Sequence, residues 1–187
     1  MNHALAPAPV AFLQQRLRRT TTFVRALIIF GGVLLVGDVA WTWISPERIL
    51  AHLADLTKVS CVDRITPEAQ VMGALWTLIP AAIIVLGLVR LWQLFSEFRA
   101  GHVFSPRALA SLRGFARCMV ASAIVAPIHG AVLSFILTWV NGPGRREISV
   151  WLSSDDYVLL LLGLVLLAMS SVMIEAARVA EDNASFV

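Results

Sequence analysis

Four long apolar stretches dominate the alternation of hydrophobic and polar positions along the chain. They cover residues of about 23–43, 71–92, 116–140 and 157–175, and each is close to the roughly 20 residues that a helix needs to cross a bilayer. Soluble core helices seldom stay this free of charge over such a length. The pattern therefore predicts an all-α integral membrane protein, a four-helix bundle that forms a single transmembrane domain over residues 1–187.

The composition agrees with this interpretation. Charged residues make up 14 % of the chain and hydrophobic residues 58 %, whereas an ordinary soluble domain is about 25 % charged. The mean hydropathy is +0.79. Lipid must therefore cover much of the surface, and 187 residues leave no room for a separate enzyme domain.

The distribution of Lys and Arg predicts the direction of the spans. Of 15 such residues, five lie in the loops 44–70 and 141–156. The other ten lie near the two termini and the 93–115 connection: Arg16, Arg18, Arg19, Arg25, Arg90, Arg99, Arg107, Arg113, Arg117 and Arg178. Positive charge collects on the cytoplasmic side of membrane proteins. Both termini and the inner loop 93–115 are thus expected in the cytoplasm, and the basic pI of about 9.5 reflects orientation and not direct nucleic-acid binding.

Proline follows a good helix-capping residue at three points, Ser45-Pro46, Thr66-Pro67 and Ser105-Pro106. Each pair predicts a helix start, because proline at the first helical position loses no hydrogen bond. The segment after Pro46 has apolar residues at helical spacing, so we expect a short helix that lies on the membrane surface or caps the bundle. Pro67 should start the second span early, and Pro106 should start a helix that runs on into the third.

Two ionisable residues lie inside predicted spans, where such groups are candidates for function. Asp38 and His129 are 15 and 14 residues from the inner ends of their spans, which places both at about 21–22 Å depth. Pro80 and Pro127 fall near the same depth, and each frees a backbone carbonyl one turn earlier. One hypothesis is a small polar pocket for a ligand, a proton or an ion; the alternative is that Asp38 reaches water at the outer interface and His129 bonds a neighbouring helix.

Small residues recur every fourth position along the third span, at Ser122, Ala126, Gly130 and Ser134. Such a ridge allows two membrane helices to approach closely. It predicts a packing seam within the chain, with a homodimer seam as the alternative.

Sequence signals of enzymatic chemistry are lacking. The four histidines are scattered, neither cysteine belongs to a C-x-x-C pair, and no phosphate-binding glycine loop is present. We therefore expect no catalytic residue, no metal site and no cofactor.

Two short stretches carry a family resemblance. The first surrounds Gly101, Phe104 and Ser105 after the second span, and the second is the tail with Glu181, Asp182 and Asn183 that ends in Phe186-Val187. Together with the four-span plan, they resemble the YoaS-like family of small bacterial membrane proteins (domain of unknown function 2975). The resemblance implies a bacterial inner-membrane location and a small helix-turn-helix DNA-binding protein as a neighbour.

Three functional hypotheses remain open. The first is a non-enzymatic regulator or sensor whose cytoplasmic face docks that DNA-binding protein through Gly101, Phe104, Ser105 and the 181–183 tail. The second is an accessory subunit of a larger membrane complex. The third is a transporter or a protein that binds a small ligand or ion through Asp38 and His129.

Overall fold

The chain folds into five α-helices, and the computed structural model, which describes residues 8–56, 65–102, 105–139 and 148–184, has no strand within them. The helices are α1 Ala8–Trp43, α2 Pro46–Leu56, α3 Pro67–Arg99, α4 Pro106–Thr138 and α5 Ser154–Ala184. Four are long and apolar enough to cross a membrane, over Thr21–Trp43, Pro67–Arg99, Pro106–Thr138 and Ser154–Val179. The prediction of an all-α protein with four helices long and apolar enough to span a membrane is confirmed.

Capping residues define the starts of α3 and α4. The Thr66 hydroxyl accepts from the Ala69 N–H at 3.3 Å, and the Ser105 hydroxyl accepts from the Ala108 N–H at 3.1 Å. Proline follows each cap at the first helical position. Both helices therefore run for 33 residues and continue from the loops into the spans without a break, as the Pro67 and Pro106 signals predicted.

A reciprocal pair of hydrogen bonds starts α5. The Ser153 hydroxyl accepts from the Asp155 N–H at 3.2 Å, and the Asp156 carboxylate accepts from the Ser153 N–H at 3.1 Å. Both bonds satisfy backbone donors that a helix start leaves without partners. The two aspartates also lie where the helix dipole favours negative charge.

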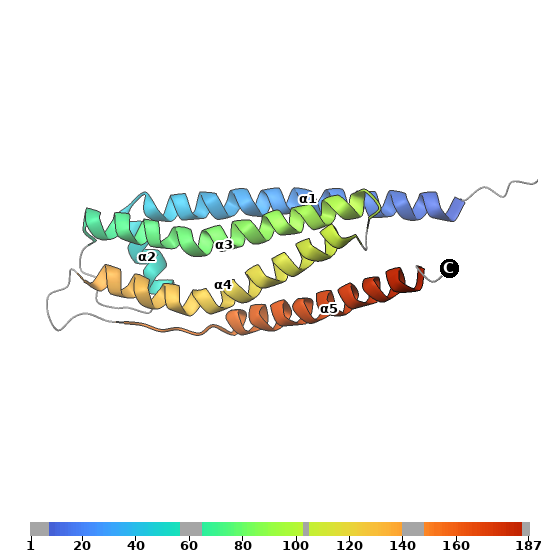
Figure 1. The fold of residues 1–187 in the computed structure, drawn as a ribbon. Helices are drawn as coiled ribbons and strands as arrows, with labels where there is room; N and C mark the ends of the chain where they lie inside the picture. Colours follow the sequence, from blue (N-terminus) through green and yellow to red (C-terminus); the bar gives the residue numbers. More distant parts are fainter. Residues whose placement is uncertain (1–7, 57–64, 103–104, 140–147, 185–187) are drawn as a thin grey trace, which may run out of the picture.

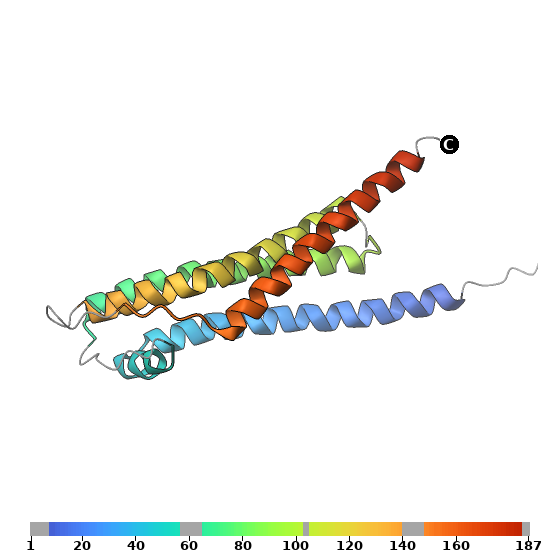
Figure 2. The same ribbon diagram turned by 90° about the horizontal axis from the view of Figure 1, so that it is seen from below.

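The spanning helices follow one another side by side in the order α1, α3, α4, α5 (Figure 1). The main packing pairs are α1 with α3, α3 with α4, and α4 with α5, and the short α2 packs against α1. Viewed from below, α5 crosses the α3–α4 pair obliquely (Figure 2). This arrangement leaves α1 and α5 at the two edges of the assembly, with α3 between α1 and α4.

Helix α2 caps one end of the α3–α4 pair. Ile49 is buried to 2 % exposure against Leu133 and Leu137 of α4 and Ala69 of α3. Trp43, Ile65 and Trp76 pack around this cluster. Of the two placements expected for the segment after Pro46, capping the bundle is thus the observed one. We call this end of the molecule the α2 end, and the opposite end, with residues 99–106 between α3 and α4, the connector end.

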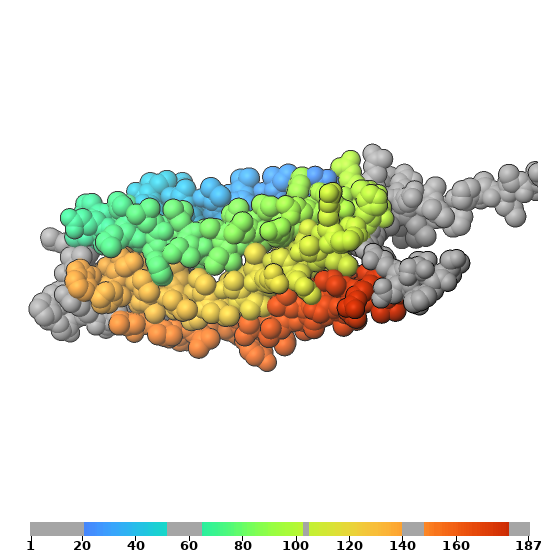
Figure 3. All heavy atoms as spheres, in the orientation of Figure 1, coloured from blue at the N-terminus to red at the C-terminus, as the bar shows by residue number. Residues whose placement is uncertain are grey.

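Most side chains of the spans face outward. The buried share of the most apolar window is 6 % in α1 and reaches only 22 % in α4. The space-filling view shows α1 alongside α3 and α5 alongside α4 (Figure 3). Exposed Phe, Leu, Ile and Val side chains on all four helices suit a lipid surround, and helices satisfy their own backbone hydrogen bonds there.

Candidate functional site

His129 on α4 lies against Trp76 on α3. The two rings are parallel within 3°, with centroids 6.4 Å apart. The Trp76 indole N–H donates to the His129 carbonyl oxygen at 3.3 Å. This contact is in the half of the α3–α4 interface nearer the α2 end, and Trp76 also packs against the cluster that α2 caps. The histidine is therefore fixed in a protein interface.

Pro80 and Pro127 lie within α3 and α4, and both helices continue past them. Because proline has no N–H, Pro80 removes the usual helical donor of the Trp76 carbonyl. Pro127 does the same for Ala123, which is buried. Pro80 thus alters the backbone of the residue that holds His129.

The Nε2 atom of His129 is buried and has no hydrogen-bond partner among the described residues. A buried polar atom without a partner costs about 1–3 kcal/mol. Such atoms are few in native proteins, and a ring nitrogen can accept from an N–H or O–H of a bound molecule. His129 is consequently the strongest candidate for ligand binding inside the spans.

Asp38 is not brought to His129. It is exposed on α1, an edge helix whose main neighbours are α3 and α2, and α3 lies between α1 and α4. No hydrogen bond or ion pair joins the two residues in the described part of the chain. Asp38 and His129 therefore lie at a similar depth without facing one another. The candidate site consists of His129, Trp76 and the backbone that Pro80 and Pro127 alter.

The ridge of small residues on α4 is only partly used for packing. Ser134 is 1 % exposed, and its hydroxyl accepts from the Ser149 N–H at 3.0 Å, which holds the extended segment before α5 against α4. Ser122 and Ala126 are half-buried. Gly130 has open space where a Cβ would lie, so no helix approaches closely there.

Closer approaches between helices occur at other glycines, among them Gly87 and Gly163. A Cβ added to Gly87 of α3 would lie 3.3 Å from the Cβ of Cys118 on α4. One added to Gly163 of α5 would lie 2.8 Å from a methyl group of Val120 and 3.1 Å from its backbone nitrogen. Each is a single glycine in a long apolar run, without the repeated spacing on which the sequence reasoning relied.

The connector end has a defined backbone turn at the Gly101 segment. The His102 N–H donates to the Glu97 carbonyl at 3.0 Å, and the Gly101 N–H donates to the Phe98 carbonyl at 3.1 Å. These two bonds form a Schellman motif, which needs a left-handed residue after the helix. Gly101 supplies it with φ of +84°, so this glycine has a structural role.

Ser105 joins the two helices of the connector. Besides capping α4, its hydroxyl donates to a Glu97 carboxylate oxygen at 3.1 Å. The same oxygen lies 3.9 Å from Nδ1 of His102. Glu97, His102 and Ser105 thus form a polar cluster at the surface of this end.

The predicted docking face also includes Phe104, Glu181, Asp182 and Asn183. Phe104 lies outside the described residues, and so do the side chains of Glu181, Asp182 and Asn183, although α5 itself continues to Ala184. Within the part of the chain that the structure describes, no three His, Cys, Asp or Glu side chains lie together as metal ligands would.

Comparison with known proteins places the chain in a family. No curated protein and no solved structure matches it. A family model described as "Protein of unknown function (DUF2975)" matches residues 50–187. The match covers the connector, the three later spans and the tail that carried the resemblance. The chain therefore belongs to the DUF2975 family of proteins of unknown function.

Proposed function

We propose that the protein is a non-enzymatic regulator or sensor of the bacterial inner membrane, and that its connector end faces the cytoplasm and docks a small helix-turn-helix DNA-binding protein. The DNA-binding partner is inferred from the resemblance to the YoaS-like family, which implies such a protein as a neighbour. The proposal assigns no substrate and no cofactor. It gives the connector end the task of binding a soluble protein and the spans the task of holding it at the membrane.

The shape of the connector end is the observation that carries this proposal. Helix α1 begins at Ala8, whereas the apolar stretch of the first span begins at about residue 23, so about 20 Å of helix precedes that stretch. Helix α5 likewise continues to Ala184, beyond an apolar stretch that ends at about residue 175. Both ends project past the α3–α4 turn (Figure 1). Two projecting helices beside a structured turn offer a soluble protein several contacts at once.

The charge distribution supports the orientation. The projecting part of α1 carries Arg16, Arg18 and Arg19, and the connector carries Arg99 and Arg107. An excess of arginine marks the cytoplasmic side. The end from which the helices project is therefore the end that is expected to face the cytoplasm.

Co-purification from native membranes tests the proposal. A tagged full-length chain is expected to recover a DNA-binding protein in stoichiometric amount, and a chain that lacks residues 181–187 is expected to lose it. Equal insertion of the two chains into membranes is the control. Recovery of lipid and the chain alone contradicts the proposal, and stoichiometric recovery of a respiratory or transport assembly would instead support an accessory subunit.

The unpartnered nitrogen of His129 favours a second candidate, a protein that binds a small ligand within the α3–α4 interface. Such a ligand would form a hydrogen bond with Nε2. Screening small molecules for thermal stabilisation of the wild type that is lost in His129→Phe tests it. A set of ligands that stabilise both proteins equally would contradict it.

A further inference from the structure

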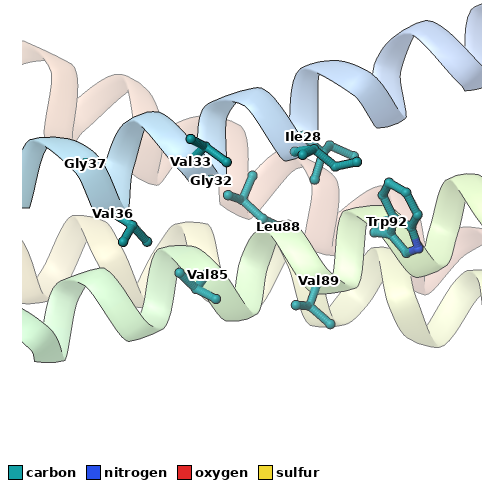
Figure 4. Close-up of a pocket in the computed structure, with 10 residues that line it drawn as sticks. Ile28, Gly32, Val33, Val36, Gly37, Val85, Leu88, Val89 and Trp92 are labelled. Atoms are coloured by element: carbon teal, nitrogen blue, oxygen red, sulfur yellow. The ribbon is translucent and has the colours of Figure 1, made fainter.

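An apolar groove runs between α1 and α3 in the half of the molecule nearer the connector end. Its volume is about 690 Å³. From α1 it is lined by residues that include Ile28, Gly32 and Val36, and from α3 by Val85, Leu88 and Trp92 (Figure 4). Gly32 faces Leu88 across the groove, and a Cβ there would lie 3.7 Å from the Leu88 side chain. The small glycine thus keeps the middle of the groove open.

A cation lies at the connector end of this groove. The guanidinium carbon of Arg25 is 3.7 Å from the centroid of the Trp92 ring, and Trp92 is one of the lining residues. Arg25 precedes Ile28 by one helical turn on α1. The groove therefore leads directly to a guanidinium group held by stacking on an aromatic ring.

The charge of Arg25 has no counterpart in the described part of the chain. No carboxylate there is within ion-pair distance, and its Nε atom is buried without a hydrogen-bond partner. Arg48, which stacks in the same way on Trp41, instead donates to the Trp41 carbonyl at 3.5 Å and lies outside the spans. Arg25 lies within the first apolar stretch, close to its start at about residue 23, where an unpaired cation is unfavourable.

We infer that this groove and Arg25 form a binding site for a phospholipid of net negative charge, with its phosphate on Arg25 and one acyl chain in the groove. Guanidinium and phosphate form strong, often bidentate hydrogen bonds. The lining from Ile28 to Gly37 spans nine residues, or about 14 Å. That length matches the roughly 15 Å of one leaflet.

The same seam of helices provides an internal comparison. A second apolar groove of about 550 Å³ lies between α1 and α3 nearer the α2 end, with Leu35, Ala40 and Ala81 among its lining residues. Neither groove has a charged residue among its lining side chains, but Trp92 of the first groove contacts the Arg25 guanidinium. The second groove is therefore not expected to discriminate between lipids by the charge of the headgroup. The cation at Trp92 thus distinguishes a specific lipid site from an ordinary apolar surface.

Charge also favours a lipid over a second copy of the chain. A symmetric dimer that packs through this groove would present the same patch twice. It would bring a second Arg25 to the same depth in the membrane. An anionic phosphate instead neutralises the one cation present.

Native mass spectrometry of the full-length chain tests this inference. The protein is released from detergent with phosphatidylglycerol or phosphatidylcholine of identical acyl chains, and the retained lipid is counted over a concentration series. The wild type is expected to retain phosphatidylglycerol on the order of tenfold more tightly, the effect of one charge-assisted contact. Glycerol 3-phosphate, which lacks acyl chains, is expected not to displace it.

Three variants separate the parts of the site. Arg25→Gln should abolish the preference for phosphatidylglycerol, whereas Arg107→Gln, an exposed arginine at the same end, should keep it. Arg25→Lys retains the positive charge that orients the span, but it should still weaken retention, because an ammonium cannot stack and bind phosphate through two parallel bonds. If Arg25→Gln fails to insert into the membrane, Arg25→Lys still tests whether the Arg25 guanidinium binds the phosphate.

The groove itself is tested by a pair of neighbouring glycines. Gly32→Leu should fill the groove and reduce retention of both lipids, whereas Gly31→Leu, whose position does not line it and meets nothing within 4 Å, should not. Equal retention of the two lipids by the wild type would overturn the inference. So would displacement by glycerol 3-phosphate, an unchanged preference in both Arg25 variants, or a dimer that excludes lipid.

Discussion

The hydroxyl of Ser105 joins two helices, since it caps α4 by accepting from Ala108 and donates to the Glu97 carboxylate of α3 at 3.1 Å. The turn between these helices is closed on its other side by Gly101 with its positive φ. Two of the residues that carried the family resemblance thus shape the turn. These two residues therefore hold the backbone of the proposed docking surface in place.

Replacing Ser105 tests this structural role. Ser105→Ala removes both hydrogen bonds and is expected to lower the free energy of unfolding by about 1–2 kcal/mol. Ser105→Asp keeps a capping oxygen but places a second carboxylate beside Glu97, so its stability should also fall. Thermal unfolding in detergent, with the Ser154→Ala change of an exposed serine as control, measures the effect. An unchanged midpoint for Ser105→Ala would contradict it.

The close contact of α5 with α4 at Gly163 gives a second prediction. Gly163→Ala brings a Cβ against Val120 and is expected to lower the free energy of unfolding by about 1–3 kcal/mol, because the backbone nitrogen of Val120 cannot move away as a flexible side chain would. Gly130→Ala is the matched control on α4, since open space surrounds that position. Equal stability of the two variants would show that α4 and α5 do not approach at Gly163.

His129→Phe tests whether its ring nitrogen lacks a partner. Phenylalanine keeps a ring beside Trp76 and removes the buried Nε2, so the free energy of unfolding should stay the same or rise by about 1 kcal/mol. Trp76→Phe removes the donor to the His129 carbonyl and should lower it by about the same amount. Chemical unfolding in mixed micelles compares the two. A loss above about 2 kcal/mol in His129→Phe would indicate a partner for the nitrogen.

The proposed orientation predicts which residues a membrane-impermeant thiol reagent reaches. In a chain with Cys61→Ser and Cys118→Ala, Glu68→Cys at the α2 end should be labelled in intact cells. His102→Cys at the connector end should be labelled only after the membrane is opened. Both positions are exposed. The reverse pattern would contradict the assignment of the connector end to the cytoplasm.

The fold was largely predictable because its strongest signals are local. A long run of apolar residues predicts a span. Thr66-Pro67 and Ser105-Pro106 predict helix starts, because the hydroxyl caps the helix and proline suits the first helical position. Such signals do not depend on which helices become neighbours. They therefore predicted the existence and the starts of α3 and α4 correctly.

The candidate site was less predictable because it depends on helix order and rotation. Depth along a helix follows from counting residues, which put Asp38 level with His129, but counting does not tell which face each helix presents. The pairing of Arg25 with Trp92, 67 positions apart in the sequence, depends on the same packing of α1 on α3. Gly87 and Gly163 were missed for this reason as well, whereas the regular spacing at Gly130 suggested a contact that the helices do not make.

Photo-crosslinking from single positions in intact cells directly tests whether the connector end docks a DNA-binding protein. A crosslinking residue is placed at exposed Arg107 of the connector end or, as control, at exposed Glu68 of the α2 end. The residue at position Arg107 is expected to capture a helix-turn-helix DNA-binding protein, and the residue at position Glu68 is not. Capture of only lipid or the chain itself from Arg107, or capture of the same protein from Glu68, would contradict the proposed docking.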